Sequence, residues 1–297
     1  MTPPGHPERP ERLAAALEGA AAAGAVAVVS TIAEASAVDA ARTVHAASLI
    51  ERLRALSDRG RGFVDTPDNP VSAGSFRAAW RAVGACVDAA AVIEAGKADI
   101  VWAAVRPPGH HARHDHAMGY CFFNNIAAAA ESLLARGIGP LAIVDFDVHH
   151  GNGTQEHFYQ RDDVYFVSIH QYPFFPGTGS ADETGAGRGL GFTRNVPLAA
   201  GADDETYFGA VALGLDEVTR TIRPAVWLIS AGFDAHQNDP LGGMRLSEPG
   251  FARIGAMIAE VSGGRPVLAV MEGGYERKAL RESVRSFLDG LAGNAAP

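Results

Sequence analysis

Short apolar runs alternate along the chain with longer segments whose apolar residues recur at helical spacing. Tyr207, Val211, Leu215, Val218 and Ile222 form one such stripe. The short runs are typical of strands buried on both faces, because a strand with one solvated face would alternate apolar and polar residues. Strands of this kind, separated by helices, predict an α/β fold in three layers, with a central, mainly parallel sheet and helices on both faces.

The same pattern sets the boundaries that we expect for individual elements. Strands are predicted at 25–29, 100–105, 141–146, 164–169, 225–230 and 266–270. Helices are predicted at 13–23, 38–56, 75–94, 124–136, 207–222 and 276–291, with one more beginning at Ser247-Glu248-Pro249. Prolines and glycines predict loops at 60–72 and 177–191. No stretch resembles a linker or a repeat, so we expect one domain.

Ionisable residues gather where the predicted strands end. Those that follow or close the five strands after position 100 are His110, His111, Asp145, Asp147, His149, His170, Asp234, Glu272 and Tyr275. Because the carboxyl ends of parallel strands face one crevice, where ligands bind, we expect these side chains to lie close together.

The tightest group of these residues has metal-ligand spacing. Alternation along an extended chain puts Asp145, Asp147 and His149 on one side. Buried carboxylates need a cation or a proton to be tolerable. With Asp234 as third ligand, Asp147 and His149 would leave one coordination position for water, which is typical of a catalytic zinc. The adjacent His110 and His111 are then candidate acid and base, since imidazole titrates near neutrality.

Composition narrows the class of protein. The 297 residues carry 25 Lys and Arg against 34 Asp and Glu, a net charge of −9, with no basic run. This argues against binding of nucleic acid through its phosphates, which requires clustered cations. Two cysteines, Cys86 and Cys121, cannot form a disulfide framework. We find no membrane span or signal peptide and expect a cytoplasmic protein; nothing predicts its oligomeric state.

Ordered motifs over almost the whole chain resemble those of the histone deacetylase and acetylpolyamine amidohydrolase superfamily. The motifs are GHPERPER at 5–12, RPPGHH at 106–111, GYCFFNN at 119–125, DFDVHHGNGT at 145–154, FFPGTG at 174–179, SAGFDAH at 230–236, DPLGG at 239–243 and EGGY at 272–275. They are most similar to the class II-like bacterial members. The resemblance implies an arginase-like α/β fold, a histone deacetylase-like domain over residues 1–297, and hydrolysis of acetyl-amides at one zinc ion.

The resemblance also implies which residues bind ions. Asp147, His149 and Asp234 would hold zinc, with Fe²⁺ as an alternative metal. A structural potassium ion would lie on a set that shares mostly backbone oxygens: Asp145, Asp147, His149, Ser168 and Ile169.

Catalytic and substrate-binding roles follow by motif position. His110 would pair with Asp145 and His111 with Asn152, while Tyr275 would hydrogen-bond the substrate carbonyl. Residues expected at the channel or its rim are Gly119, Tyr120, Phe175, Leu241 and Asp65, with Asp68 as a second candidate for the rim aspartate. Asp145 is charged, so its partner His110 should favour the imidazolium; the neutral Asn152 should leave the pKa of His111 nearer the operating range. We therefore expect His111 to act as general base and then acid.

Two departures from the family pattern stand out. The chain begins at the His-Pro-Glu motif, whereas family members usually carry an earlier strand, so we expect either a misassigned start or a sheet one strand short. Asn152 stands where some members have aspartate, as is usual in the class II-like branch.

Three alternatives stay open at this point. A two-metal ureohydrolase would need further carboxylates where Gly151 and His236 stand. A non-catalytic module that binds acylated ligands is the second alternative. Within the enzyme interpretation, the apolar Leu241 favours a small-molecule or peptide substrate of the acyl-lysine type, whereas the acidic charge would suit acetylpolyamines.

Overall fold

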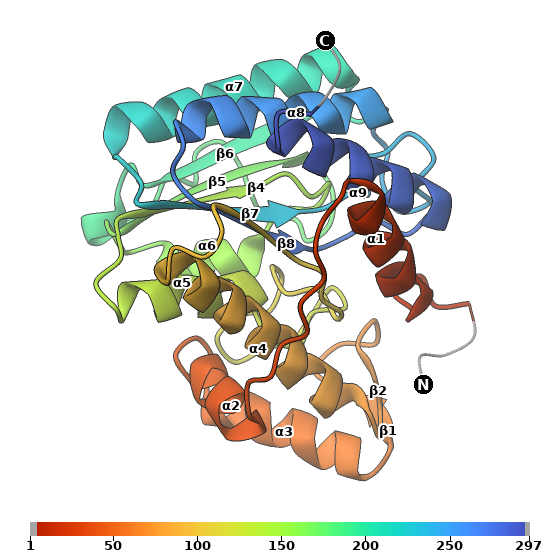
Figure 1. Cartoon of the computed structure of the whole chain (residues 1–297). Coiled ribbons are helices and arrows are strands. Elements are labelled where there is room, and N and C mark those ends of the chain that lie inside the picture. Colours follow the sequence, from red (N-terminus) through yellow and green to blue (C-terminus); the bar gives the residue numbers. More distant parts are fainter. Residues whose placement is uncertain (1–4, 295–297) are drawn as a thin grey trace.

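A six-stranded parallel sheet forms the centre of the molecule (Figure 1). The computed structural model describes residues 5–294. In sheet order the strands are β3 (Ile100–Ala103), β8 (Val267–Met271), β7 (Val226–Ala231), β4 (Leu141–Asp145), β5 (Val164–Gln171) and β6 (Thr193–Leu198). Each neighbouring pair is parallel, so all six carboxyl ends lie at one edge of the sheet.

Helices cover both faces of this sheet and complete the three predicted layers (Figure 1). The core on one face is packed by α1 (Glu11–Ala22), α7 (Asp204–Thr221), α8 (Glu248–Ser262) and α9 (Arg277–Leu291). The other core is packed by α2 (Glu34–Arg42), α3 (Ala47–Asp58), α4 (Ser75–Glu94), α5 (Asn125–Leu134) and α6 (Asn152–Phe158). The predicted fold class is therefore confirmed. No helix in residues 5–294 combines the length and apolarity of a membrane span.

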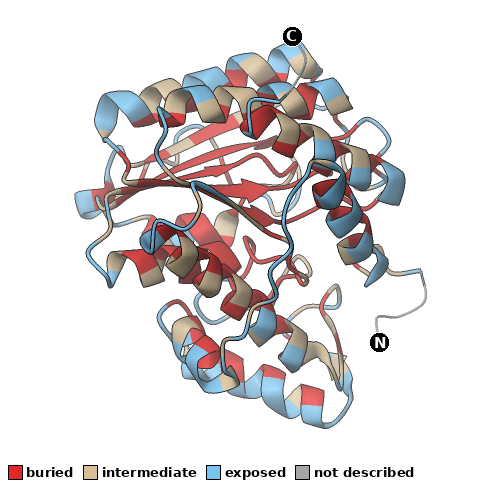
Figure 2. Ribbon diagram, in the orientation of Figure 1, coloured by how far each residue is buried: buried red, intermediate tan, exposed pale blue. Residues whose placement is uncertain are grey.

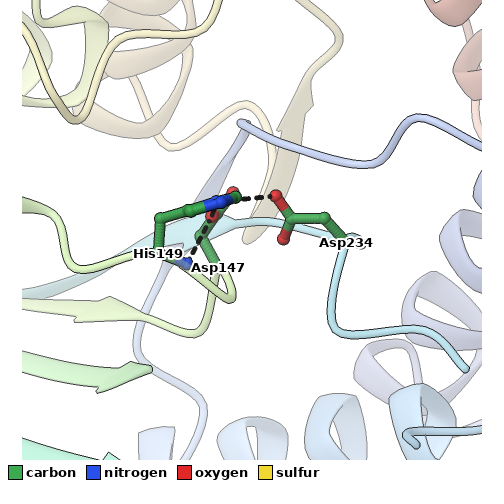
Figure 3. Close-up of side chains that lie close together, drawn as sticks. All are labelled: Asp147, His149 and Asp234. Carbon is green, nitrogen blue, oxygen red and sulfur yellow. Dashed lines mark hydrogen bonds and ion pairs between the residues drawn. The ribbon is translucent and has the colours of Figure 1, made fainter. Parts of the chain in front are cut away.

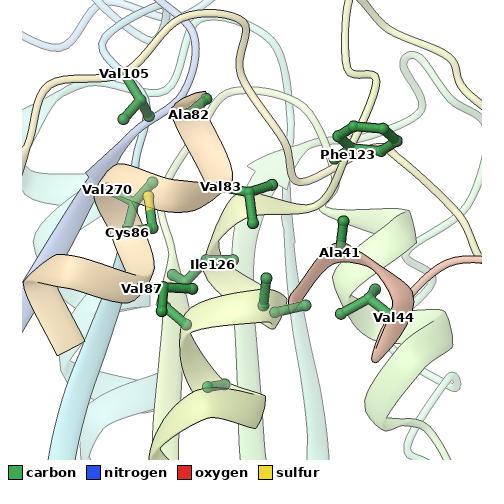
Figure 4. Packing of buried hydrophobic residues seen from close by; sticks show 14 of the residues in the cluster. Ala41, Val44, Ala82, Val83, Cys86, Val87, Val105, Phe123, Ile126 and Val270 are labelled. Atoms are coloured by element: carbon green, nitrogen blue, oxygen red, sulfur yellow. The ribbon is translucent and has the colours of Figure 1, made fainter. Parts of the chain in front are cut away.

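Alternating residues of each strand enter the two cores. Val270 of β8 belongs to the core that α4 and α5 cover, together with Val83, Val87 and Ile126 (Figure 4). The next residue, Met271, belongs to the opposite core. Both faces of the four inner strands, β8, β7, β4 and β5, are thus buried (Figure 2), and this explains why their sequences are continuous apolar runs.

The helices α8 and α9 pack closely against each other at Gly290 of α9. A Cβ on Gly290 would lie 2.0 Å from the carbonyl oxygen of Ala252, which belongs to the facing helix. We expect Gly290→Ala to push the helices apart and to lower the free energy of unfolding by about 1–3 kcal/mol, the usual cost of overpacking. Urea unfolding of the two proteins measures this. A Cβ on Gly209 in α7 would meet no neighbouring segment within 4 Å, so Gly209→Ala should stabilise by up to about 1 kcal/mol. Equal changes in the free energy of unfolding for the two variants would show that contact between the helices at Gly290 does not restrict residue size.

Most predicted elements lie within a few residues of their predicted ends, and Ser247 caps α8 by accepting a hydrogen bond from the Gly250 N–H. The strand predicted at 25–29 is wrong. This segment has no strand or helix structure, and Val26, Val28 and Val29 are more than 80% exposed. Apolar residues alone do not make a strand, because its backbone groups need a neighbouring strand to bond.

Other differences have local physical causes. The helix predicted at 38–56 is two helices, α2 and α3, separated where His45 turns inward to bond the backbone of Arg113 and Asn124. Within the loop predicted at 60–72 lies a small hairpin of β1 (Arg61–Phe63) and β2 (Pro70–Ser72). Strand β6 lies at the sheet edge and carries Arg194 and Asn195, so a search for uninterrupted apolar runs overlooks it. The short helix α6 also escaped prediction.

Candidate active site

Two carboxylates and an imidazole converge just beyond the ends of two adjacent strands. Asp147 and His149 follow β4 and Asp234 follows β7, and their ligand atoms all lie within 4.8 Å of one another. Figure 3 shows the three side chains directed toward one another. His149 Nδ1 lies 3.1 Å from Asp147 Oδ1 and 3.2 Å from Asp234 Oδ2. The sequence placed these three residues together correctly.

Backbone amides hold the two carboxylates in place. The N–H of Gly273 donates to Asp147 Oδ2 at 2.7 Å, and the N–H of Val148 donates to Asp234 Oδ1 at 2.9 Å. A Cβ on Gly273 would lie 2.0 Å from Asp234 Oδ2, so glycine is required for the chain to pass this close. The carboxylate oxygens are therefore fixed by the chain itself.

This donor set fits a divalent metal ion. Both carboxyl groups are fully buried, and Asp234 Oδ2 contacts the candidate ligand His149, whose Nδ1 lies 3.2 Å away. Burial and the charge of Asp147 raise the pKa of Asp234. Burial alone would lower the pKa of His149, but Asp147 and Asp234 raise it to about 10. The two carboxylates thus favour a positive charge at His149, and the same pair of buried oxygens would stabilise a bound cation. Three such ligands leave room for a fourth, as in catalytic zinc sites.

The two adjacent histidines lie beside this cluster with different partners. His110 Nδ1 contacts Asp145 Oδ2 at 2.9 Å, and His111 Nδ1 contacts Asn152 Oδ1 at 2.7 Å. The ring centres are 4.0 Å apart. Both histidines therefore have the partners that the sequence predicted.

Their electrostatic environments differ strongly. Burial disfavours a charged His110, but Asp145 and Asp147 outweigh it and raise the pKa of His110 to about 10. Burial lowers the pKa of His111 well below its ordinary value, and the charged His110 lowers it further. The raised pKa of His110 agrees with the imidazolium that the sequence predicted at this residue. The expectation for His111 was wrong, since its pKa does not stay near neutrality: a buried imidazole beside a positive charge stays neutral.

Tyr275 lies beyond the glycine pair that follows β8. Its side chain is buried, its N–H donates to Asp239 Oδ2 at 2.6 Å, and the Arg12 guanidinium lies 4.6 Å from the ring centre. The ring is 5.8 Å from that of Tyr120. Burial raises the pKa of the Tyr275 hydroxyl well above its ordinary value, so it remains a proton donor.

Aromatic rings and a glycine surround the histidines. Phe175 lies 5.2 Å from the His111 ring, centre to centre, and is 42% exposed. Phe174 stacks on the ring of His149 at 5.3 Å. Gly119 has φ +58°, and a Cβ there would lie 2.3 Å from the His111 ring, so only glycine lets this segment approach. Gly119 and Phe175 thus lie against His111, and their roles in substrate binding stay predictions; Phe174 was not predicted as a site residue.

The remaining predicted residues have partners within the chain. Asp65 bonds Arg52 and the N–H of Ala117, and Asp68 accepts the N–H of Gly119 at 2.7 Å. Leu241 is half-buried, and its N–H donates to Asp239. Ser168 and Ile169 are buried in β5, and Ser168 Oγ bonds His170. Rim and potassium roles stay predictions.

Sequence reasoning did not identify two residues that hold the Tyr275 turn, Arg12 and Asp239. Arg12 donates to the carbonyl oxygens of Glu272 and Gly274, both at 2.5 Å, and Asp239 accepts the Tyr275 N–H. Arg12 stands about 260 positions before its acceptors, so no local pattern could reveal the contact. The motif GHPERPER was the one signal that marked it.

Comparisons with known proteins agree with this geometry. The histone deacetylase domain family matches residues 6–291. The histone deacetylase-like amidohydrolase of Pseudomonas aeruginosa is 39% identical over 276 residues, which cover 85% of this chain and 72% of that protein. The crystal structure of the HDA15 HD domain superposes with a TM-score of 0.88 at 36% identity, covering 99% of this chain and 84% of that one. The acetylpolyamine aminohydrolase of Burkholderia pseudomallei has a TM-score of 0.87 at 33% identity, covering 97% and 91%.

Proposed function

The chain belongs to the histone deacetylase domain family of metal-dependent deacetylases and amidohydrolases, and from this premise we propose that it removes acetyl or related short acyl groups from acyl-lysine-type amides at a single zinc ion. The observation that carries the proposal is the buried cluster of Asp147, His149 and Asp234 beside a histidine pair of unlike charge. Fe²⁺ is the alternative metal, and a structural potassium ion near Ser168 is part of the proposal.

The role that we assign to each of the two histidines follows from the charge that its surroundings favour. A zinc ion held by the three ligands supplies an acidified water and a Lewis acid for the amide carbonyl. The neutral His111 accepts the proton of the attacking water at Nε2, because Asn152 occupies Nδ1. His111 then returns that proton to the leaving amine. The charged His110 stays protonated and adds positive potential where negative charge develops.

Tyr275 and the aromatic residues complete the proposed site. The Tyr275 hydroxyl donates a hydrogen bond to the carbonyl oxygen as it becomes an oxyanion. Tyr120 and Phe175 offer apolar faces to an aliphatic chain that carries the acyl-amide, and Gly119 lets this wall lie against His111. The exposed edge of Phe175 would place the substrate entrance there.

Metal removal tests the function directly. We expect the purified protein to release amine from a fluorogenic acetyl-lysine peptide, to lose more than about 90% of that turnover after chelation, and to regain it with one zinc equivalent per chain, since activity depends on the acidified water. Metal analysis by mass spectrometry measures the stoichiometry. Turnover that survives complete metal removal would refute the proposal, and two equivalents would favour the ureohydrolase. Against that alternative, His236 packs on Phe251 and contacts Glu248 rather than the cluster.

The substrate class that we propose depends on Leu241, the residue expected at the rim of the channel. Leu241 is apolar and half-buried, whereas a polyamine-selective rim would need a carboxylate to bind the distal ammonium. We expect turnover of acetyl-lysine peptide to exceed that of acetylputrescine, and Leu241→Glu to shift the ratio of the two kcat/KM values toward acetylputrescine by about fivefold, the worth of about 1 kcal/mol. Leu241→Gln is the control for size and polarity. An unchanged ratio in the glutamate variant would remove Leu241 from substrate selection.

A further inference from the structure

Glu272 is a fully buried carboxyl group that the proposed mechanism does not use. It directly follows β8, at the edge of the sheet where the site lies. Its Oε2 accepts the N–H of Gly109 at 2.6 Å and that of His110 at 3.2 Å. Its Oε1 accepts the Ser230 hydroxyl at 3.4 Å. The side chain therefore reaches from the end of β8 to the turn that carries the two histidines.

The backbone next to Glu272 holds the opposite side of the site. Its carbonyl oxygen accepts a hydrogen bond from Arg12, and the N–H of the next residue, Gly273, donates to the metal-ligand candidate Asp147. Tyr275 follows two residues later. One residue thus joins the histidine turn, through its side chain, to the segment that carries the tyrosine and touches the metal cluster.

We propose that Glu272 is a positioning residue, whose carboxyl oxygen fixes the His110-His111 turn at a set distance from the turn that carries Tyr275. The inference rests on the proposed function, because it assigns both turns to one reaction. In the proposed reaction the general base and the oxyanion donor act on the same carbonyl group, so their separation has to match the substrate within a fraction of an ångström.

The environment of Glu272 favours a role as hydrogen-bond acceptor over a role as charge. Burying a carboxyl group is costly unless its oxygens are bonded. The two backbone N–H groups meet that need without a cation in contact. Burial raises the pKa of Glu272 to about 7, although the charge of His110 opposes this. A neutral group of the same length should therefore serve as well, provided that it keeps an acceptor oxygen in the same position.

Two variants of Glu272 distinguish the effect of side-chain length from the effect of charge. Glu272→Gln keeps the length and an acceptor oxygen but loses the charge, whereas Glu272→Asp keeps the charge but is one methylene shorter. We expect E272Q to keep kcat within about threefold and E272D to lower kcat about tenfold to a hundredfold, with KM changed by less than about threefold and zinc content unchanged. Glu131→Asp is the matched control, because Glu131 is a carboxylate on α5 that bonds His157 and Arg161 outside the site.

Amide hydrogen exchange supplies a readout that needs no turnover. The amides of Gly109 and His110 should exchange as slowly in E272Q as in the wild type and faster in E272D. Wild-type kcat together with protected amides in E272D would overturn the proposal, and so would an E272Q variant as slow as E272D. Should E272D fail to fold, loss of protection in E272Q overturns it. A wild type inactive on every acyl-amide refutes the proposed function instead, while exchange in the variants still judges the contact.

Discussion

Replacing Asp234 with asparagine is expected to lower zinc affinity by more than about a hundredfold, beyond what the loss of an outer-shell partner costs, and to remove deacetylase turnover with it. The asparagine oxygen can still accept the Val148 N–H, and the volume is unchanged, so the fold should remain. The substitution removes one of the two buried negative charges that hold the cation. Zinc content after dialysis and turnover of acetyl-lysine peptide measure the two effects.

A stability measurement distinguishes a metal ligand from a merely structural carboxylate. Without metal, burial and the charge of Asp147 outweigh the attraction of His149 and raise the pKa of Asp234, so an ionised Asp234 opposes folding. In the presence of chelator, Asp234→Asn should therefore be at least as stable toward urea as the wild type; with zinc, the wild type should be the more stable. A variant that retains stoichiometric zinc at wild-type affinity would contradict the assignment of Asp234.

Replacing Tyr275 with phenylalanine is expected to lower kcat by at least about a hundredfold, the usual loss when one well-placed oxyanion donor is removed. The ring would still lie against the Arg12 guanidinium, and the N–H of residue 275 would still bond Asp239, so the turn should keep its shape. Zinc content should be unchanged, since Tyr275 belongs to no part of the ligand cluster. Turnover and metal analysis on the same preparation test both statements.

The matched control for Tyr275→Phe is Tyr207→Phe. Tyr207 is also fully buried, on α7, and its hydroxyl has no hydrogen-bond partner. Removing that hydroxyl should leave kcat unchanged. If Tyr275→Phe kept wild-type turnover, the tyrosine would have no part in the chemistry, and His110 with the metal would have to stabilise the oxyanion without it.

The sequence predicted the centre of the fold and the metal cluster because both depend on local rules. Continuous apolar runs identify strands buried on two faces, and the topology of a parallel sheet then brings their carboxyl ends together. Asp147 and His149 are two residues apart, and Asp234 follows a strand that proves to be the neighbour of β4. Once those strands are recognised, the three ligands need no further information to converge.

The features that escaped prediction depend on distant or collective contacts. The supports that Arg12 and Glu272 give to the site join segments more than 160 positions apart. The pKa of His111 is set by burial and by charges on its neighbours, which depend on the packed structure rather than on its partner Asn152 alone. The segment at 25–29 has strand-like composition, but only a sheet edge beside it could make it a strand.

The amides of Gly273 and Val148 give the ligand cluster its shape before any ion arrives. A receptor whose donors are arranged in advance loses little conformational freedom on loading. The rate at which one cation replaces another should then be limited by proton release and by access to the site, as for a rigid chelator, rather than by refolding of the protein. A spectroscopically visible substitute such as cobalt, introduced into the emptied protein, would on this view report the native coordination faithfully.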